Sequence, residues 1–222
     1  MQTVMSRRRA GERRPGLSVT AGLRVLLAAA LLWAGAAHAN EALNEALWAR
    51  LKQGGQVVLI RHALTEPGIG DPPGFLLADC GTQRNLSDAG RQEAQRLGAA
   101  FRARGIRIAR VLSSPWCRCI DTAKIAFGAA QPHPALGNLF DRQQNRERQL
   151  ATFRELVAKA PKTGNLILVT HGSTTAAFTG VHPATSEMVV LTPGSGGQFQ
   201  VAGRIAVANA DSISTETPGT VK

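Results

Sequence analysis

The sequence is short of acidic residues, of cysteine and of long apolar runs, and each shortage excludes a class of protein. Its 15 acidic residues stand against 26 basic ones. Six of the basic residues and one of the acidic residues lie in residues 1–39, which leaves a net charge of +6 for the rest of the chain. That charge suits a protein that binds anionic substrates. Because no Lys/Arg run is interleaved with aromatic residues, nucleic-acid binding is disfavoured.

The longest apolar run lies near the N-terminus and is too short for a comfortable transmembrane helix, which needs about 20 apolar residues. It covers Val25–Ala34, follows a basic region with six arginines, and precedes the small-x-small sequence Ala-His-Ala at residues 37–39. These are the three parts of a secretory signal peptide. We expect residues 1–39 to be removed after export, with membrane contact only through this segment. An uncleaved anchor is the alternative, and the Arg pair at residues 7–8 leaves the export route open.

The chain has three cysteines, and no fourth cysteine or neighbouring histidine completes a tetrahedral zinc set. A zinc site is therefore disfavoured, and we expect no metal and no cofactor. Export would place these cysteines in an oxidising compartment. Cys117 and Cys119 are poorly placed to bridge each other, so the expected disulfide joins Cys80 to either Cys117 or Cys119. Three free thiols are the alternative.

Three apolar segments with the character of buried strands end in basic residues. Residues 57–60 lead to Arg61 and His62, residues 165–170 lead to His171, and residues 111–114 lead through Pro115 to Arg118. In open α/β sheets, ligands bind outside the carboxyl ends of the strands. Arginine forks bind phosphoryl oxygens bidentately, and a neutral imidazole can attack phosphorus. The pattern therefore predicts a pocket for a phosphoryl group.

These motifs resemble the histidine phosphatase (phosphoglycerate mutase-like) superfamily. The resemblance rests on Arg-His-Ala at residues 61–63, Asn-Leu-Ser-x-x-Gly at 85–90, Ser-Ser-Pro-x-x-Arg-x-x-Asp-Thr-Ala at 113–123 and Thr-His-Gly at 170–172. It covers roughly residues 56–206 and is greatest for secreted bacterial members, including those that act on phosphorylated lipopolysaccharide sugars. It implies a three-layer α/β/α sandwich with a mostly parallel central sheet. Residues 40–208 would form this single domain, and residues 209–222 a polar C-terminal tail.

The resemblance also implies roles for individual residues. His62 would be the nucleophile, and Arg61, Arg118 and His171 would bind the phosphoryl oxygens, with His171 also part of the catalytic set. Thr65 would add a hydroxyl contact to phosphate. Asp141 is the expected general acid, with Glu147 and Glu66 as alternatives. Asp121, before Thr-Ala, is expected to brace the arginine-bearing helix. Two departures are Ala63, where the family commonly has Gly, and Gly68, where mutase-like members have an Asn.

The function that follows is hydrolysis of a small-molecule or glycan phosphomonoester through a phosphohistidine intermediate, by a periplasmic or secreted bacterial enzyme that needs no metal. A binding module for phosphate or anionic glycans, without turnover, is one alternative. A phosphoglycerate mutase-type phosphotransferase is another, which export disfavours. The sequence leaves the substrate and the oligomeric state open.

Apolar spacing and turn residues predict the elements between these motifs. The predicted helices cover residues 41–52, 87–104 with Ser87 as N-cap, 117–127, 146–159 and 173–180. The predicted strands cover residues 57–60, 106–112, 138–141 as an edge strand, 165–170, and 187–191 paired with 198–207 as a hairpin. Residues 66–79 are expected to be a Pro/Gly-rich loop at the rim of the pocket, and residues 131–137 to be irregular.

Overall fold

The computed structural model describes residues 41–140 and 143–207. The chain divides into two compact units, Met1–Leu43 and Asn44–Lys222, and only residues 41–43 of the first are described, at the start of a helix that ends at residue 53. The predicted signal peptide, Asp141 and the tail from residue 209 lie outside the described residues. Within the described part of the chain, no helix combines the length and apolar character needed to cross a membrane.

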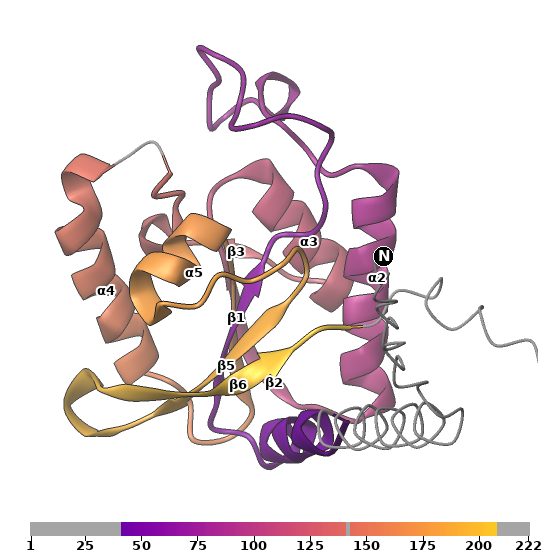
Figure 1. The fold of residues 1–222 in the computed structure, drawn as a ribbon, viewed down its shortest axis with the longest axis vertical. Coiled ribbons are helices and arrows are strands. Elements are labelled where there is room, and N and C mark those ends of the chain that lie inside the picture. Colours follow the sequence, from indigo (N-terminus) through magenta and orange to yellow (C-terminus); the bar gives the residue numbers. More distant parts are fainter. Residues whose placement is uncertain (1–40, 141–142, 208–222) are drawn as a thin grey trace, which may run out of the picture. The chain divides into compact units, whose positions relative to one another are not determined.

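In the described residues, six strands form one mixed sheet in the order β3-β2-β4-β1-β5-β6 (Figure 1). β1, β4, β2 and β3 run parallel to one another, and β5 is antiparallel to both β1 and β6. The sheet is therefore mostly parallel, as predicted. The strands are β1 Val57–Arg61, β2 Ile108–Ser113, β3 Gln131–Pro132, β4 Asn165–Thr170, β5 Met188–Pro193 and β6 Phe199–Ile205.

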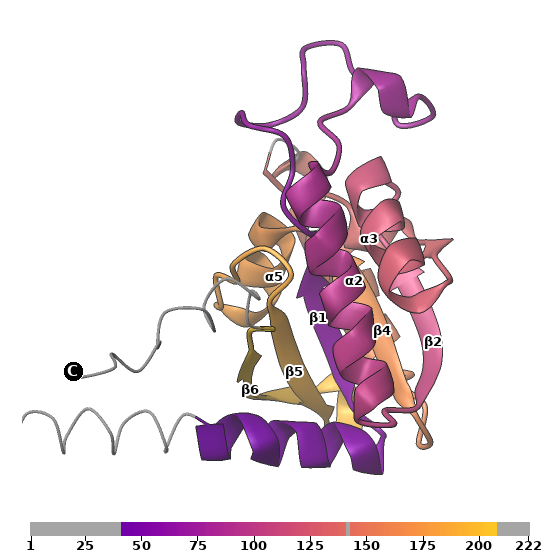
Figure 2. The same cartoon turned by 90° about the vertical axis from the view of Figure 1, so that its right-hand side faces the viewer.

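Helices cover both faces of this sheet, because alternate residues of each strand point to opposite sides. On one face, Val58 of β1 belongs to the same apolar cluster as Phe101 of helix α2. On the other face, Leu59 clusters with Phe153 of helix α4. Figure 2 shows α2 and α3 side by side on the first face. The three-layer α/β/α arrangement is confirmed, with helices α2 Asp88–Ala103, α3 Cys117–Phe127, α4 Arg146–Ala158 and α5 Gly172–Thr179.

Helix α2 begins where the sequence predicts and fixes the segment that follows β1. Ser87 is its N-cap, and the Ser87 Oγ accepts a hydrogen bond of 3.2 Å from the Gly90 N–H. A side chain at Gly90 would place its Cβ only 1.8 Å from the Leu64 carbonyl oxygen. Glycine at this position therefore lets the start of α2 lie directly against Leu64, two residues after His62.

The predicted edge strand at residues 138–141 is wrong for residues 138–140, the part that the structure describes. An edge strand, β3, forms instead within the segment expected to be irregular, and a 3-10 helix follows it at Pro134–Leu136. The backbone N–H groups of Leu139 and Phe140 donate to the side-chain oxygens of Thr174 and Asn138 instead of to a neighbouring strand. Side-chain acceptors therefore take the place of a strand partner.

Candidate active site

A cavity of about 510 Å³ lies where β1 and β4 end, and the two predicted histidines and two predicted arginines meet in it. Arg61 and His62 reach it from β1, His171 from the end of β4, and Arg118 from the first turn of α3. The sequence motifs, which are up to 110 residues apart, therefore form one site. Its other lining residues are Gly68, Ile69, Gly70, Arg84, Asn138, Phe140, Gly172, Ser173, His182 and Pro183.

His62 is buried and has one ring nitrogen engaged. Its Nδ1 lies 2.9 Å from the Ala63 carbonyl oxygen, which can only accept, so Nδ1 carries the proton and Nε2 keeps its lone pair. The pKa of His62 is lowered to about 3, first by burial, then by the positive charge of Arg118, with smaller effects from Arg61 and Arg84. The imidazole is therefore neutral at ordinary pH, which is the state in which it can act as a nucleophile.

His171 faces His62 edge-on, with ring centroids 5.4 Å apart. Its Nε2 lies 2.8 Å from the Ser114 Oγ, while its Nδ1 is buried without a hydrogen-bond partner. Burial, followed by the neighbouring His62 and Arg118, holds the pKa of His171 well below its usual value. With the Ser114 hydroxyl donating to Nε2, the Nδ1–H is available to donate to an oxyanion bound beside His62.

Arg61 and Arg84 supply positive charge from the two ends of the loop segment that follows β1. The Nη1 of Arg61 donates to the Pro183 carbonyl oxygen at 2.9 Å, while its Nε is buried without a partner. Arg84 was missed by the sequence analysis, although it stands just before the predicted Asn85–Gly90 motif. It donates to the carbonyl oxygens of Gly68 and Gly70, at 2.9 and 2.8 Å, and lines the cavity.

Thr65 contacts one of the site's arginines. It does not line the cavity, and its hydroxyl accepts a hydrogen bond of 2.7 Å from the Arg84 Nη1. Thr65 thereby orients a guanidinium that lines the cavity, and its direct contact with phosphate stays a prediction.

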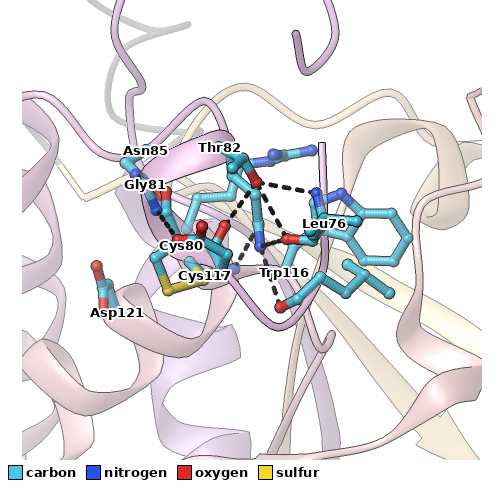
Figure 3. Close-up of a disulfide and its surroundings, with 12 residues drawn as sticks. Leu76, Cys80, Gly81, Thr82, Asn85, Trp116, Cys117 and Asp121 are labelled. Atoms are coloured by element: carbon cyan, nitrogen blue, oxygen red, sulfur yellow. Dashed lines mark hydrogen bonds between the residues drawn. A yellow bond between two sulfur atoms is a disulfide. The ribbon is translucent and has the colours of Figure 1, made fainter. Parts of the chain in front are cut away.

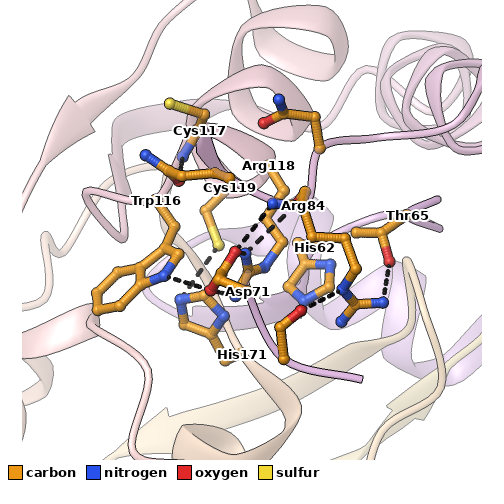
Figure 4. A network of polar contacts seen from close by, with 12 residues as sticks. His62, Thr65, Asp71, Arg84, Trp116, Cys117, Arg118, Cys119 and His171 are labelled. Carbon is orange, nitrogen blue, oxygen red and sulfur yellow. Dashed lines mark hydrogen bonds and ion pairs between the residues drawn. The ribbon is translucent and has the colours of Figure 1, made fainter. Parts of the chain in front are cut away.

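Arg118 is paired with Asp71, a second residue that the sequence analysis missed (Figure 4). Its Nη1 and Nη2 lie 2.6 and 3.2 Å from the two carboxylate oxygens. The same carboxylate accepts hydrogen bonds from the Trp116 Nε1 and the Arg84 backbone N–H. Burial on its own would raise the pKa of Asp71, but the hydrogen bonds and charge of Arg118 outweigh it and lower the pKa below its usual value. Asp71 is therefore a stable carboxylate and a poor proton donor.

A disulfide attaches the loop after β1 to the start of α3 (Figure 3). It joins Cys80 and Cys117, with an S–S distance of 2.02 Å. The Gln83 side chain reinforces the attachment, because its oxygen accepts a hydrogen bond from the Cys117 N–H. Cys119 is free and buried, and burial raises the pKa of its thiol to about 12. The loop that carries Asp71 is thus fixed beside Arg118 by a covalent bond and an ion pair.

The residues expected to supply a proton are not brought into this cavity by the described part of the chain. Asp141 lies outside the described residues, directly after the cavity-lining Phe140. Glu66 and Glu147 are both exposed, and neither lines the cavity. Asp121 lies 3.8 Å from Arg91 and thereby connects α3 to α2. Across the described residues, no group of three His, Cys, Asp or Glu side chains could hold a metal ion.

Chemically, the site places a neutral imidazole beside a second imidazole and three guanidinium groups. Three buried N–H positions, on Arg61, Arg118 and His171, have no protein acceptor. Buried polar groups are normally hydrogen-bonded, so unpaired donors in a cavity indicate an anionic ligand. A phosphoryl group, which has several acceptor oxygens, is a ligand suited to such donors.

Comparisons with known proteins agree with this geometry. Residues 57–141 match the family model of the histidine phosphatase superfamily (branch 1). No curated protein sequence matches the chain.

Solved structures with a similar fold include mycobacterial hydrolase 2, with 16% identity, a TM-score of 0.51, and coverage of 71% of this chain and 94% of that one. A proposed alpha-ribazole-5′-P phosphatase of Escherichia coli K-12 has 16% identity, a TM-score of 0.50, and coverage of 66% and 94%. The protein histidine phosphatase SixA in complex with tungstate has 17% identity, a TM-score of 0.49, and coverage of 68% and 96%. The family model thus places residues 57–141 of the chain in the histidine phosphatase superfamily (branch 1), and the likeness to the first two structures shows a shared fold.

Proposed function

We propose that this chain is a phosphomonoesterase that transfers a phosphoryl group to His62 and then to water, without a metal ion. The observation that carries the proposal is the neutral, tautomer-fixed His62 beside the unpaired donors of Arg61, Arg118 and His171. A non-catalytic anion site needs the donors but has no use for an imidazole whose Nε2 lone pair is free.

The first step forms a bond between the His62 Nε2 and phosphorus and breaks the bond between phosphorus and the ester oxygen. The Nδ1–H bond to the Ala63 carbonyl keeps the ring in place and stabilises the positive charge that develops on it. Arg61, Arg118 and the His171 Nδ1–H donate to the phosphoryl oxygens, whose charge is spread in the transition state, and Arg84 adds positive charge beside them. The departing oxygen takes its proton from a carboxylic acid, for which Asp141 remains our candidate.

The second step reverses the first with water in place of the alcohol. Water gives up a proton to the carboxylate formed in the first step, its oxygen bonds to phosphorus, and the phosphorus–nitrogen bond breaks. His62 returns to its neutral form and inorganic phosphate leaves. The guanidinium groups supply the charge that a metal ion would supply elsewhere, so no metal is required.

The test compares His62→Ala with His133→Ala, a histidine outside the cavity. His62→Ala should abolish hydrolysis of nitrophenyl phosphate while circular dichroism is unchanged, and His133→Ala should keep most of the activity. The wild type, quenched during turnover, should carry an acid-labile phosphoryl group on His62. Chelators should leave the rate unchanged. Retained turnover in His62→Ala would exclude the covalent mechanism.

A binding module without turnover is the second candidate, and it is favoured by the exposed positions of Glu66 and Glu147, which put neither of them in the cavity. It predicts that the wild type binds inorganic phosphate but hydrolyses no phosphomonoester in a broad panel.

We also propose that the enzyme is exported and acts in the periplasm or outside the cell, as the N-terminal sequence indicates. A chain expressed with its N-terminus intact should be recovered from the periplasm or medium with Asn40 as its first residue. Recovery of the full-length chain from the membrane fraction would favour an uncleaved anchor.

A further inference from the structure

A second cavity, of about 360 Å³, lies next to the candidate phosphoryl site and has no role in the chemistry described above. Asn138 lines both cavities. Trp116 lines the second cavity, and its ring packs edge-on against the catalytic-site His171, with centroids 5.1 Å apart. The two cavities therefore meet at Asn138, with the indole of Trp116 beside the junction.

The walls of the second cavity are mainly apolar. Leu77, Pro115, Trp116, Pro134 and Ala135 contribute carbon surface, and polar groups of α4 and the turn before it complete the lining. Ligand pockets typically have this composition, with apolar walls and a few polar groups that fix orientation.

The position of Trp116 is fixed from several directions. Its Nε1–H donates to the Asp71 carboxylate at 3.0 Å, and the ring of Phe75 lies 6.1 Å away. A Cβ at Gly137 would approach the indole Cζ3 to 3.1 Å, so glycine there lets the backbone lie close against the ring. The indole is therefore a preformed wall that needs little reorganisation when a ligand binds.

The floor of the cavity is fixed in the same way. The Gln149 side chain of α4 donates to the carbonyl oxygens of Ala135 and Gly137, at 3.2 and 2.7 Å. These bonds attach α4 to the 3-10 helix at Pro134–Leu136. The Trp116 wall and the floor of the cavity are thus both held by hydrogen bonds within the chain.

The mouth of the candidate phosphoryl site has an apolar rim as well. Ile69 and Phe140 line that site although 91% and 57% of their respective surfaces are exposed. Exposed large apolar side chains at the edge of a pocket commonly mark a binding surface. A compact, strongly hydrated leaving group such as glycerol would use neither this rim nor the adjoining cavity.

We propose that the second cavity is the leaving-group subsite and that the substrate is a phosphomonoester of a ring-bearing alcohol with a flat apolar face. This inference rests on the proposed function, because it places the phosphoryl group between His62 and His171. The ring would then lie in the adjoining cavity against Trp116, and polar substituents would face the α4 side chains.

The test measures binding without turnover, so that it does not depend on catalysis. Calorimetric titrations compare 2-naphthylmethylphosphonate with methylphosphonate, which share one head group and differ in the ring. The wild type should bind the naphthyl compound at least about 10-fold more tightly. Thr152→Trp, which fills the cavity from α4, should remove most of that preference. Leu77→Trp fills it from the opposite wall and should do the same, which guards against misfolding of one variant.

Ala151→Trp is the matched control, because Ala151 is exposed on α4 and does not line the cavity. It should keep the preference for the naphthyl compound. Equal affinities for the two phosphonates in the wild type, or an unchanged preference in both filled variants, would overturn the subsite. If the subsite exists but the chain is not a phosphomonoesterase, the result is different. Both phosphonates then bind to the wild type, but it hydrolyses neither 2-naphthyl phosphate nor acetyl phosphate.

Discussion

The Asp71 carboxylate and the Arg118 guanidinium form a two-point ion pair, with N–O distances of 2.6 and 3.2 Å, in which both side chains are almost fully buried. Asp71 belongs to the loop after β1, and Arg118 to the first turn of α3. The pair therefore fixes the loop relative to the helix and leaves the Nε of Arg118 as its unpaired donor.

Breaking this pair should be costly, because a buried guanidinium would lose its counter-charge. We expect Asp71→Asn to lower the free energy of unfolding by about 3–5 kcal/mol, measured by urea denaturation. It should also lower kcat/KM for nitrophenyl phosphate. The amide keeps only one of the two acceptor oxygens, so either the Trp116 Nε1–H or the Arg84 backbone N–H loses its acceptor.

The matched control is Asp121→Asn, which removes a carboxylate from the long, partly exposed pair with Arg91. Such pairs contribute about 0–1 kcal/mol. Equal losses in the two variants would show that Arg118 does not depend on Asp71 for its counter-charge.

The disulfide should stabilise the same loop. Cys80 and Cys117 are 37 residues apart, and closing a loop of that length in the unfolded chain corresponds to about 4 kcal/mol in the chain-entropy model. The double variant Cys80→Ser/Cys117→Ser should lose stability of that order. Alkylation of the native wild type should modify no cysteine, because the buried Cys119 thiol has a pKa raised to about 12. Denaturation should expose one thiol, and reduction two more.

Peptide mapping of the oxidised protein should link Cys80 to Cys117. A peptide that links Cys80 to Cys119, or three thiols alkylated in the unfolded protein before reduction, would contradict the pairing. Cys119→Ala should keep the disulfide and is the control for loss of a cysteine as such.

The parts of the fold that could be predicted are those with a strong local signal. The buried run at β1 and the capped helix α2 have one, and both occur where expected. The edge strand predicted at residues 138–141 had only a weak signal. The backbone N–H of Leu139 donates to the side chain of Thr174, which is 35 residues away in the sequence. Local sequence patterns cannot reveal such a partner.

The same distinction applies to the site. His62 and His171 follow apolar strands, so the strand pattern places them at one edge of the sheet. Arg84 and Asp71 lie on irregular backbone whose position depends on a disulfide and on a buried ion pair. Thr65 was assigned to phosphate by resemblance, and the local pattern did not reveal its hydrogen bond with Arg84.

Stability should fall in mild acid because His62 is buried in its neutral form. Its pKa is about 3 in the native state against 6.5 when unperturbed, so below pH 6.5 the unfolded chain binds a proton that the native chain does not. The contribution of neutral His62 to the free energy of unfolding is therefore fully present above pH 6.5, and it is lost progressively as pH falls toward 3. Between pH 7 and 5 the loss from His62 is about 2 kcal/mol.

His62→Gln should remove this contribution, so its unfolding free energy should fall less between pH 7 and 5 than that of the wild type. His171, whose pKa is also lowered, contributes in the same direction and remains in both proteins. Asp71 titrates below 3.8 and does not contribute in this range. Parallel pH profiles for the wild type and His62→Gln would show that the native His62 takes up a proton as readily as the unfolded chain does.

The last prediction concerns the general acid. An alkoxide leaves only with a proton, whereas nitrophenolate leaves readily without one. Asp141→Asn should therefore slow hydrolysis of an alkyl phosphate far more than that of nitrophenyl phosphate. General acid catalysis is typically worth about 10²–10⁴-fold, so the two substrates should differ clearly in steady-state kcat/KM.

Glu147→Gln and Glu66→Gln are the controls, because both side chains are exposed and neither lines the cavity. Both should behave nearly as the wild type with both substrates. If Glu147→Gln or Glu66→Gln instead shows the leaving-group dependence, the mechanism stands and that residue is the general acid. Absence of this dependence from all three variants would mean that the proton comes from the substrate or from water. The cavity would then favour esters whose alcohols leave without help, a class that includes the flat aromatic leaving groups for which the subsite beside Trp116 is shaped.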